Sequence, residues 1–226
     1  FPACAYRHVE VSCPAAGRGE KQNPGLVAAS SVESSVTRVL TCDPASIVGR
    51  HQDEPMRVSS ASATDKGLRR STNEDCVSVR EDLSLFVVAD GMGGHAAGEV
   101  ASQAAVDGIV AFIEATRTMS PDQTWPIPFD PDQSENANRL RAGFQMGNRR
   151  LAARIAAASE LRGMATTAVA VLIDGETATV AHVGDSRVYR LRDGQLDRLT
   201  RDHSWVEEQI RAGALTETAA RQHPRR

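Results

Sequence analysis

The stretch that decides the fold is Leu83-Ser84-Leu85-Phe86-Val87-Val88-Ala89-Asp90-Gly91-Met92-Gly93-Gly94-His95. Its beginning is a short, mostly apolar run, which is typical of a buried β-strand, and a helical spacing of apolar residues begins at Gly98. We therefore expect a strand that ends at the carboxylate of Asp90, followed by a glycine-rich turn into a helix. Carboxylate and carbonyl oxygens at such a turn are the ligands that a hard divalent cation prefers.

Two further acidic positions also lie at expected strand ends. Glu74-Asp75 precede a short strand that leads into the Asp90 strand, and Asp185 follows another apolar strand much later in the chain. A hairpin brings Asp75 and Asp90 together if its register allows. The acidic strand ends therefore predict a metal site at one end of a sheet. The alternatives are a solvated turn for Glu74-Asp75 and a turn in which Asp185 pairs with Arg187.

Composition and charge narrow the class of protein. The chain has 226 residues and a formal net charge of -3, a balance that does not suggest a nucleic-acid partner. The longest apolar run is too short to span a bilayer, and no stretch resembles a signal peptide. We expect a cytoplasmic protein with neither nucleic acid nor membrane as a partner. No two cysteines form a C-x-x-C pair, so we expect free thiols at Cys4, Cys13, Cys42 and Cys76.

The rest of the chain reads as one domain after an irregular segment. Residues 1–55 are punctuated by proline and glycine, so we expect a flexible tail or linker there. Residues 56–226 form the domain. Its expected elements are strands at 57–63, 76–79, 83–89, 166–173, 177–183, 188–191 and 195–199, helices from 98, across 140–155 and across 205–212, and a proline-rich loop at 120–134. This order indicates an α+β fold whose helices pack on antiparallel sheet.

The glycine-rich turn also matches a different kind of site. Gly91, Gly93 and Ala96 formally fit the dinucleotide-binding fingerprint between a strand and a helix. That fingerprint requires a parallel strand with a ribose-binding acid about 20 residues later, but here the window has helical spacing. Asp90 would also lie close to a negatively charged pyrophosphate. A dinucleotide site is therefore the weaker interpretation, and a turn without function is the plainest one.

Arg70 and three histidines are the remaining candidates for chemistry. Arg70 lies four residues before Glu74. It is either a surface arginine or a phosphate clamp, because guanidinium donates two parallel hydrogen bonds to phosphate oxygens. His95, His182 and His203 titrate near neutral pH and could transfer protons. Lone histidines are more often structural or exposed, so direct catalysis by any of them is the less favoured interpretation.

Taken together, five segments resemble the metal-dependent serine/threonine protein phosphatases of the PPM (type 2C) family, in a bacterial form. The segments are 64–75 (TDKGLRRSTNED), 88–99 (VADGMGGHAAGE), 164–168 (MATTA), 181–190 (AHVGDSRVYR) and 199–204 (LTRDHS). Their order and spacing agree from Met56 to Arg226, and residues 1–55 have no part in the resemblance.

The resemblance implies a four-layer αββα sandwich, with two central antiparallel sheets and helices outside. It also implies two Mn²⁺ or Mg²⁺ ions at one end of the sandwich. By this resemblance Asp75, Asp90 and the carbonyl of Gly91 bind metal directly, and Glu74 acts through bound water. Asp185 matches a position linked to a third, weaker metal.

The implied activity is hydrolysis of phosphoserine and phosphothreonine in proteins by a metal-activated water. Arg70 matches the phosphate-binding arginine of the family. Many members outside bacteria have a histidine where this chain has Met92, and that histidine is proposed as the leaving-group acid. The implied partners are phosphorylated proteins, with Ser/Thr kinases among them, and we expect a monomer.

Family members carry two further metal-binding aspartates beyond the position that corresponds to Arg226. We therefore expect the fold to be incomplete at the C-terminus, and a chain of this length to be poorly stable and weakly active or inactive. The competing hypothesis is a non-catalytic fragment or regulatory module of the same fold, which binds phosphoprotein or metal without hydrolysis.

Overall fold

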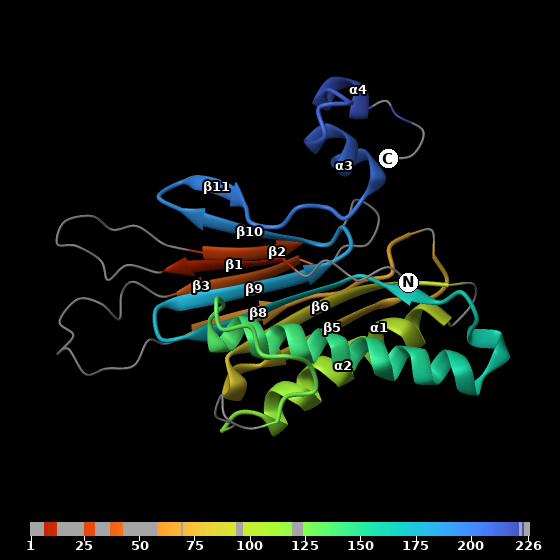
Figure 1. Ribbon diagram of the computed structural model, residues 1–226. Helices are drawn as coiled ribbons and strands as arrows, with labels where there is room; N and C mark the ends of the chain where they lie inside the picture. Colours follow the sequence, from red (N-terminus) through yellow and green to blue (C-terminus); the bar gives the residue numbers. More distant parts are fainter. Residues whose placement is uncertain are drawn as a thin grey trace.

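The computed structural model describes residues 7–12, 25–29, 37–42, 58–68, 70–93, 97–118, 124–221 and 223, with side chains from residue 58 onward. Two antiparallel β-sheets lie face to face in this part of the chain, and helices cover the outer face of the first sheet (Figure 1). All strand pairs among the described residues run antiparallel.

The first sheet has β6 at its centre. β6 pairs with β5 on one side and with β8 on the other, and β9 and β1 follow beyond β8. A two-residue strand, β7, pairs with the end of β6. The bounds are β1 Arg7–Ser12, β5 Asp75–Arg80, β6 Leu85–Met92, β7 Ala165–Thr166, β8 Ala168–Asp174 and β9 Thr177–Val183.

The second sheet follows the order β11-β10-β2-β3-β4. The bounds are β2 Gly25–Ala29, β3 Thr37–Cys42, β4 Val58–Ser62, β10 Arg187–Arg192 and β11 Gln195–Arg198. Val188 of β10 is buried in one cluster with Phe86 and Val88 of β6, and Val58 of β4 packs against the same cluster. The apolar core between the two sheets therefore includes alternate residues of β6.

The other face of β6 packs against the helices. Leu85, Val87 and Ala89 share a buried cluster with residues of α1 (Ala97–Ala115) and α2 (Glu135–Ala157). Successive residues of a strand point to opposite faces. The alternation in β6 therefore places the side chain of Asp90 on the face of Phe86 and Val88, toward the second sheet.

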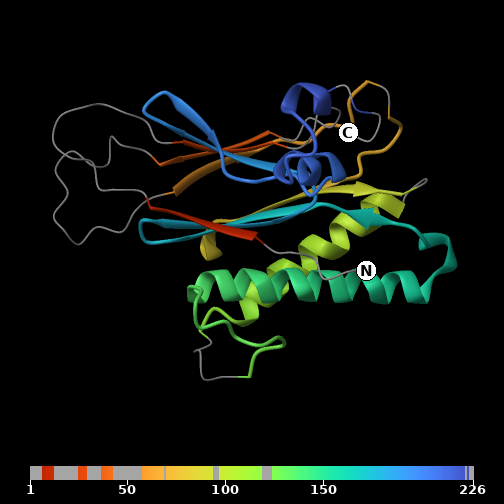
Figure 2. The same cartoon turned by 45° about the horizontal axis from the view of Figure 1, so that its top comes forward.

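Two short helices continue the chain after β11. They are α3 (Trp205–Arg211) and α4 (Glu217–Arg221), and they lie on the opposite side of the sheets from α1 and α2 (Figures 1 and 2). Ser204 caps α3, since its Oγ accepts a hydrogen bond from the Glu207 amide at 3.2 Å. The Glu207 carboxylate pairs with Arg198 at 3.4 Å.

The expected α+β class with antiparallel sheets is confirmed, and so are the expected helices and strands after residue 56, within a few residues at their ends. The expectation of a flexible tail over residues 1–55 is wrong for three segments. β1 pairs with β9, β2 pairs with β10 and β3, and β3 pairs with β4. The other residues of this stretch lie outside the described ranges, and the domain division at residue 55 stays a prediction.

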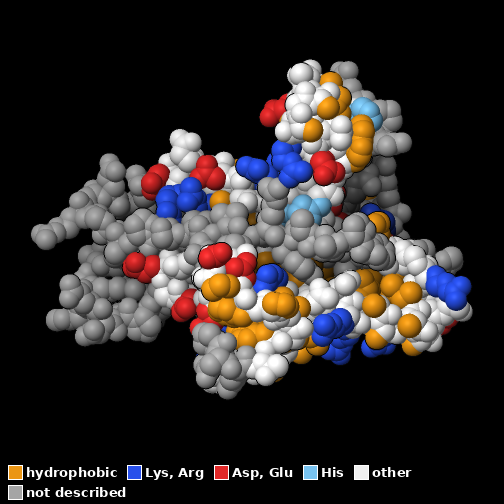
Figure 3. All heavy atoms as spheres, viewed as in Figure 1, with side chains coloured by type: hydrophobic (Ala, Val, Ile, Leu, Met, Phe, Trp, Pro, Cys, Tyr) orange, Lys and Arg blue, Asp and Glu red, His pale blue; other side chains and the backbone are white. Residues whose placement is uncertain are grey.

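The surface in Figure 3 carries acidic and basic side chains interspersed, with apolar side chains gathered over the layer of α1 and α2. A search of the described residues for a helix with the length and apolar character needed to cross a membrane finds none.

Glycines allow α1 and α2 to approach closely. A Cβ added to Gly108 would lie 2.6 Å from the Cα of Gly147, so a larger residue at position 108 must push the helices apart. A Cβ added to Gly143 would lie 3.6 Å from its nearest neighbour, the carbonyl oxygen of Ile109. Position 143 therefore has room for a methyl group, whereas position 108 has none.

We expect Gly108→Ala and Gly143→Ala to change stability in opposite directions. Overpacking costs about 1–3 kcal/mol, which outweighs the gain in helix propensity of up to about 1 kcal/mol at position 108. At position 143 only the gain applies. Urea denaturation of both variants measures the free energy of unfolding. A change of the same sign in the two variants would contradict the close contact of α1 and α2 at Gly108.

Candidate metal centre

Asp75 of β5 and Asp90 of β6 lie directly opposite each other in the first sheet. The next pair along the two strands, Glu74 and Gly91, is hydrogen-bonded, because the amide of Gly91 donates to the carbonyl of Glu74 at 3.2 Å. Hydrogen-bonded and non-hydrogen-bonded pairs alternate in an antiparallel ladder, so Asp75 and Asp90 form a non-hydrogen-bonded pair. In such pairs the Cα atoms are about 4.5 Å apart and the side chains lie close. The predicted convergence of these two carboxylates is confirmed.

The environment of Asp75 disfavours its negative charge. Its pKa is raised to about 6, first by burial and then by the neighbouring Asp90 carboxylate, with a smaller increase from Glu74. Arg70 acts in the opposite direction and lowers this pKa. Burial and the neighbouring acids together therefore outweigh the attraction of the Arg70 guanidinium.

Both carboxylate oxygens of Asp75 are buried and receive no hydrogen bond within the described residues. Buried carboxylates are normally paired, hydrogen-bonded or bound to a metal ion. Here the facing group is a second carboxylate, which cannot donate a hydrogen bond when both acids are ionised. This pair therefore fits a divalent cation, whose charge would offset both acids and whose preferred ligands are oxygen atoms.

We expect Asp75→Asn to stabilise the cation-free chain at neutral pH. A pKa of about 6, against 3.8 for an ordinary Asp, means that the folded chain binds this proton more tightly than the unfolded chain does. The associated stability is present below about pH 4 and is lost as the pH rises through about 6. The expected gain is about 1 kcal/mol near pH 7, because Asp75 as a whole residue is only half-buried and nearby solvent screens part of the interaction.

Thermal denaturation with chelator checks this expectation at about pH 4.5 and about pH 7.5. The difference between Asp75→Asn and the parent chain should be larger at the higher pH. An equal difference at both values would show that Asp75 carries no raised pKa.

Gly91 permits the close packing of the strands and helix around the aspartates. A Cβ at this position would lie 2.0 Å from the carbonyl oxygen of Gly98 and 2.7 Å from that of Glu74. A Cβ at Gly98 would likewise lie 2.3 Å from Oε1 of Glu74, so the Glu74 carboxylate lies against the first turn of α1. A side chain at either position would therefore collide with these neighbours.

Arg70 lies beside the acidic cluster. Its Nη1 is 3.6 Å from Oε2 of Glu74, and its side chain is 38% exposed whereas that of Glu74 is 16% exposed. The guanidinium is therefore held next to the cluster while part of it remains accessible from solvent. Arg70, Glu74, Asp75 and Asp90 lie in one region of the fold, as their mutual effects on the pKa of Asp75 require.

Asp185 comes from a different segment of the fold than Asp75 and Asp90, the turn that follows β9. The part of the chain that the structure describes holds no group of three or more His, Cys, Asp or Glu side chains placed to bind a metal ion. Asp185 is exposed, in the turn between β9 and β10. Its considered pairing with Arg187 is wrong, because the Arg187 guanidinium donates to both oxygens of Asp202, at 3.0 and 2.6 Å.

The histidines have structural surroundings where they are described. The rings of His182 and His203 stack with centroids 4.5 Å apart, and His182 is buried. The backbone amide of His203 donates to the carbonyl of Gly184 at 3.0 Å, and its Nδ1 accepts from the Gly184 amide at 3.4 Å. These contacts favour the structural interpretation. His95 lies outside the described residues.

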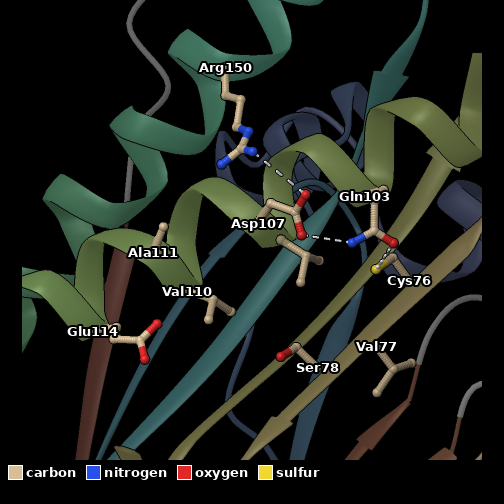
Figure 4. A pocket seen from close by; sticks show the side chains of 10 residues that line it. Cys76, Val77, Ser78, Gln103, Asp107, Val110, Ala111, Glu114 and Arg150 are labelled. Atoms are coloured by element: carbon tan, nitrogen blue, oxygen red, sulfur yellow. Dashed lines mark hydrogen bonds and ion pairs between the residues drawn. The ribbon is translucent and has the colours of Figure 1, made fainter.

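A pocket of about 370 Å³ lies beside β5 and α1, on the opposite face of β5 from Asp75 (Figure 4). Within it the Cys76 thiol donates to Oε1 of Gln103 at 3.4 Å, and Asp107 contacts both Gln103 and Arg150. Burial and the charge of Asp107 raise the pKa of Cys76 to about 11, so this thiol is a poor nucleophile.

Cys76 is a free thiol, as expected. The side chains of Cys4, Cys13 and Cys42 lie outside the described part of the chain, so the free thiols expected there stay a prediction. The dinucleotide interpretation is wrong, since β6 has antiparallel neighbours on both sides and α1 occupies the window in which the second parallel strand would have to lie.

Sequence reasoning missed three polar residues that hold the acidic cluster in place. Asn73 accepts from the amide of Asp75 at 3.1 Å, Ser102 donates to the carbonyl of Glu74 at 2.6 Å, and Thr167 accepts from the amide of Asp90 at 3.0 Å. Asn73 carries a usable signal, because Asn before a strand favours a turn in which its side chain bonds the backbone two residues on. Ser102 and Thr167 carry none, since their partners are far away in the sequence.

Known proteins share this arrangement of sequence and fold. The pattern of the protein phosphatase 2C family matches residues 68–225. The serine/threonine protein phosphatase PstP of Mycobacterium tuberculosis is 37% identical over 166 residues, which are 74% of this chain and 29% of PstP.

Two solved structures are similar in fold. Serine/threonine phosphatase Stp1 from Staphylococcus aureus gives a TM-score of 0.61 at 33% identity, covering 78% of this chain and 66% of Stp1. The catalytic domain of PstP in complex with two manganese ions gives a TM-score of 0.54 at 30% identity, covering 86% of this chain and 64% of that domain.

This chain thus spans less than a third of the curated PstP sequence and just under two thirds of the solved structures. The matched range, residues 68–225, contains Arg70, the paired aspartates of β5 and β6, and the turn that carries Asp185. By this match over most of its length, the chain belongs to the protein phosphatase 2C family.

Proposed function

We propose that this chain contributes the divalent-cation site and the phosphate-binding arginine of a protein phosphatase that hydrolyses phosphoserine and phosphothreonine. The observation that carries the proposal is the half-buried Asp75–Asp90 pair, whose buried Asp75 oxygens receive no hydrogen bond within the described residues. A solved relative binds two manganese ions, which supports a cation as the missing partner of this pair.

The residues proposed to hold the cations come from the two paired strands. Asp75, Asp90 and the carbonyl of Gly91 would bind two Mn²⁺ or Mg²⁺ ions directly, and Glu74 would act through water. Asp185 would bind a third ion. When bound, the cations supply Lewis acidity, which lowers the pKa of water and offsets negative charge on phosphoryl oxygens.

Arg70 is proposed to bind the phosphoryl group. Its guanidinium lies beside the acidic cluster and remains partly exposed, so a phosphate can reach it from solvent. Two parallel N–H donors would orient the phosphate oxygens and fix the phosphorus relative to the aspartate pair. The long contact between Arg70 and Glu74, 3.6 Å, leaves the guanidinium able to exchange one anion for another.

Several finer statements stay predictions. They are a preference for phosphorylated proteins over other phosphate esters, Ser/Thr kinases as partners, a monomeric state and a cytoplasmic location. The assignment of serine and threonine phosphates rests on the family and on the names of its relatives.

Hydrolysis of a phosphothreonine peptide and of an aryl phosphate tests the proposal. The 226-residue chain would be assayed with Mn²⁺, with Mg²⁺ and with excess chelator, and cation binding would be measured by calorimetry. We expect cation binding at the aspartate pair and turnover only when cation is present. Turnover that survives the chelator would remove the cation-dependent mechanism.

The second candidate is a module that binds cation and phosphoprotein without hydrolysis. It is favoured by one observation, that the described residues hold no group of three or more His, Cys, Asp or Glu side chains placed to bind a metal ion. Cation binding that is abolished by Asp90→Asn, together with no turnover under any cation, would support this module over the enzyme.

A further inference from the structure

We infer that Thr167 is a positioning residue that joins Asp90 and the turn carrying Asp185 into one rigid unit. This inference rests on the proposed cation site, because it concerns how two of its acidic residues are held relative to each other. Thr167 lies between β7 and β8, at the point where the first sheet passes from one strand to the next.

Thr167 holds both backbone polar groups of Asp90. Its amide donates to the Asp90 carbonyl at 2.9 Å, as in a regular antiparallel ladder. The Asp90 amide, however, donates to Oγ1 of Thr167 at 3.0 Å, where a regular ladder would use the Thr167 carbonyl. The Thr167 carbonyl instead accepts from Oγ1 of Thr166 at 2.8 Å. A side-chain hydroxyl has therefore taken the place of a backbone acceptor beside the metal-site aspartate.

The same hydroxyl reaches the turn between β9 and β10. Oγ1 of Thr167 lies 2.6 Å from Oγ of Ser186, which is buried. A hydroxyl has one donor and two acceptor sites, so Oγ1 can accept from the Asp90 amide and share a second hydrogen bond with Ser186. One oxygen atom thus links the backbone of Asp90 to the residue that follows Asp185.

The methyl group of Thr167 fixes the other side of this turn. Gly184 has a φ of +93°, and a Cβ at Gly184 would lie 2.7 Å from Cγ2 of Thr167. On its far side Gly184 exchanges two hydrogen bonds with His203, from the His203 amide to the Gly184 carbonyl and from the Gly184 amide to Nδ1. The turn is therefore held between Thr167 and His203.

This arrangement determines where Asp185 can be. Asp185 is exposed, and its carboxylate makes no hydrogen bond or ion pair with the described residues. Its position then depends on the backbone of the turn, and the turn depends on Gly184 and Ser186, both of which contact Thr167. Loss of the Thr167 hydroxyl should loosen Asp185 and Asp90 together.

The test compares three variants of the 226-residue chain. Thr167→Val removes the hydroxyl and keeps the shape, and Thr167→Ser keeps the hydroxyl. Thr179→Val is the matched control, because Thr179 is a buried threonine of the same sheet whose Oγ1 has no hydrogen-bond partner within the described residues. All three would be compared with the parent chain well below their unfolding temperatures.

The first readout is hydrogen exchange of the Asp90 amide without cation, measured by NMR. Thr167→Val should lose protection at this amide by about 10-fold or more, whereas Thr167→Ser and Thr179→Val should keep it. Unchanged protection in Thr167→Val would overturn the inference. This readout requires neither bound cation nor turnover, so it remains decisive if the proposed function fails.

The second readout is Mn²⁺ affinity by calorimetry. Residues that orient ligands typically change metal affinity by about 10–100-fold when replaced, and we expect that loss for Thr167→Val, with recovery in Thr167→Ser. If Thr167→Val binds Mn²⁺ as tightly as the parent chain does, the inference is overturned and the proposed cation site is left intact. Absence of Mn²⁺ binding in the parent chain would instead contradict the proposed function.

A double-mutant cycle tests the coupling itself. If Thr167 positions Asp185, then Thr167→Val should weaken Mn²⁺ binding less in a chain that already carries Asp185→Ala, because the residue being positioned is gone. If the effects of the two substitutions on Mn²⁺ affinity are additive, Thr167 does not act through Asp185.

Discussion

Replacing Asp90 by asparagine is expected to abolish tight cation binding and to reduce any phosphatase turnover by about 10²–10³-fold or more. Removal of one partner from a buried charged interaction costs about 3–5 kcal/mol, and each 1.36 kcal/mol corresponds to a factor of ten. Asparagine keeps the size of the side chain and the backbone contacts with Thr167, so the change is confined to the charge.

The fold of this variant should be retained. The Asp90 carboxylate is the second-largest cause of the raised pKa of Asp75, so its removal relieves repulsion in the cation-free chain. We expect Asp90→Asn to unfold at the same or a higher temperature than the parent chain in the presence of chelator. Lost binding together with a preserved fold identifies Asp90 as a ligand.

Asp107→Asn is the matched control for this experiment. Asp107 is an acidic residue of α1 on the opposite face of β5, where it contacts Gln103 and Arg150 (Figure 4). Its replacement removes the same charge from the chain at a different place. Equal losses of Mn²⁺ affinity in both variants would show that total charge, and not the aspartate pair, attracts the cation.

Replacing Arg70 by alanine is expected to lower kcat/KM for a phosphothreonine peptide by about 10–100-fold. Hydrogen bonds to charged groups contribute about 1.5–3 kcal/mol, and the guanidinium can donate two of them to a phosphate. Arg70→Lys should recover only part of the loss, because an ammonium group keeps the charge without the bidentate geometry.

A measurement of Mn²⁺ affinity distinguishes the effect of Arg70→Ala from that of Asp90→Asn. The Arg70 guanidinium is positive and lies near Asp75, and it lowers the pKa of Asp75. Its removal should leave Mn²⁺ affinity unchanged or raise it, since one repulsive charge is lost. Calorimetry of Arg70→Ala measures this directly, and a loss of affinity comparable to that of Asp90→Asn would contradict a role restricted to phosphate.

The expected elements after residue 56 agree with the structure because their signals are local. The apolar run that became β6, the spacing that became α1 and the serine that caps α3 each depend on residues within one or two turns or a few strand positions. The short helix α4 carries too little periodicity to be recognised in this way, and it was not expected.

The strands at residues 7–12, 25–29 and 37–42 show the opposite case. Their sequences are short and lie among prolines and glycines, so no local pattern separates them from an irregular segment. Each becomes a strand by pairing with a partner strand, and β1 pairs with β9 more than 160 residues later. A strand edge has unpaired backbone groups that can hydrogen-bond to a segment that reaches it. The sequence of such a segment does not indicate which edge it will reach.

By itself the sequence determined the identity of the acidic residues, the strands that carry Asp75 and Asp90, and the glycine needed beside them. The tertiary structure alone decided that these two aspartates form the close, non-hydrogen-bonded type of cross-strand pair, because register depends on how whole strands align. It also decided that a threonine 77 positions away from Asp90 holds its amide, and that Arg187 pairs with Asp202 and not with Asp185. Strand formation is set by neighbours in the chain, whereas the meeting of side chains is set by packing between distant segments.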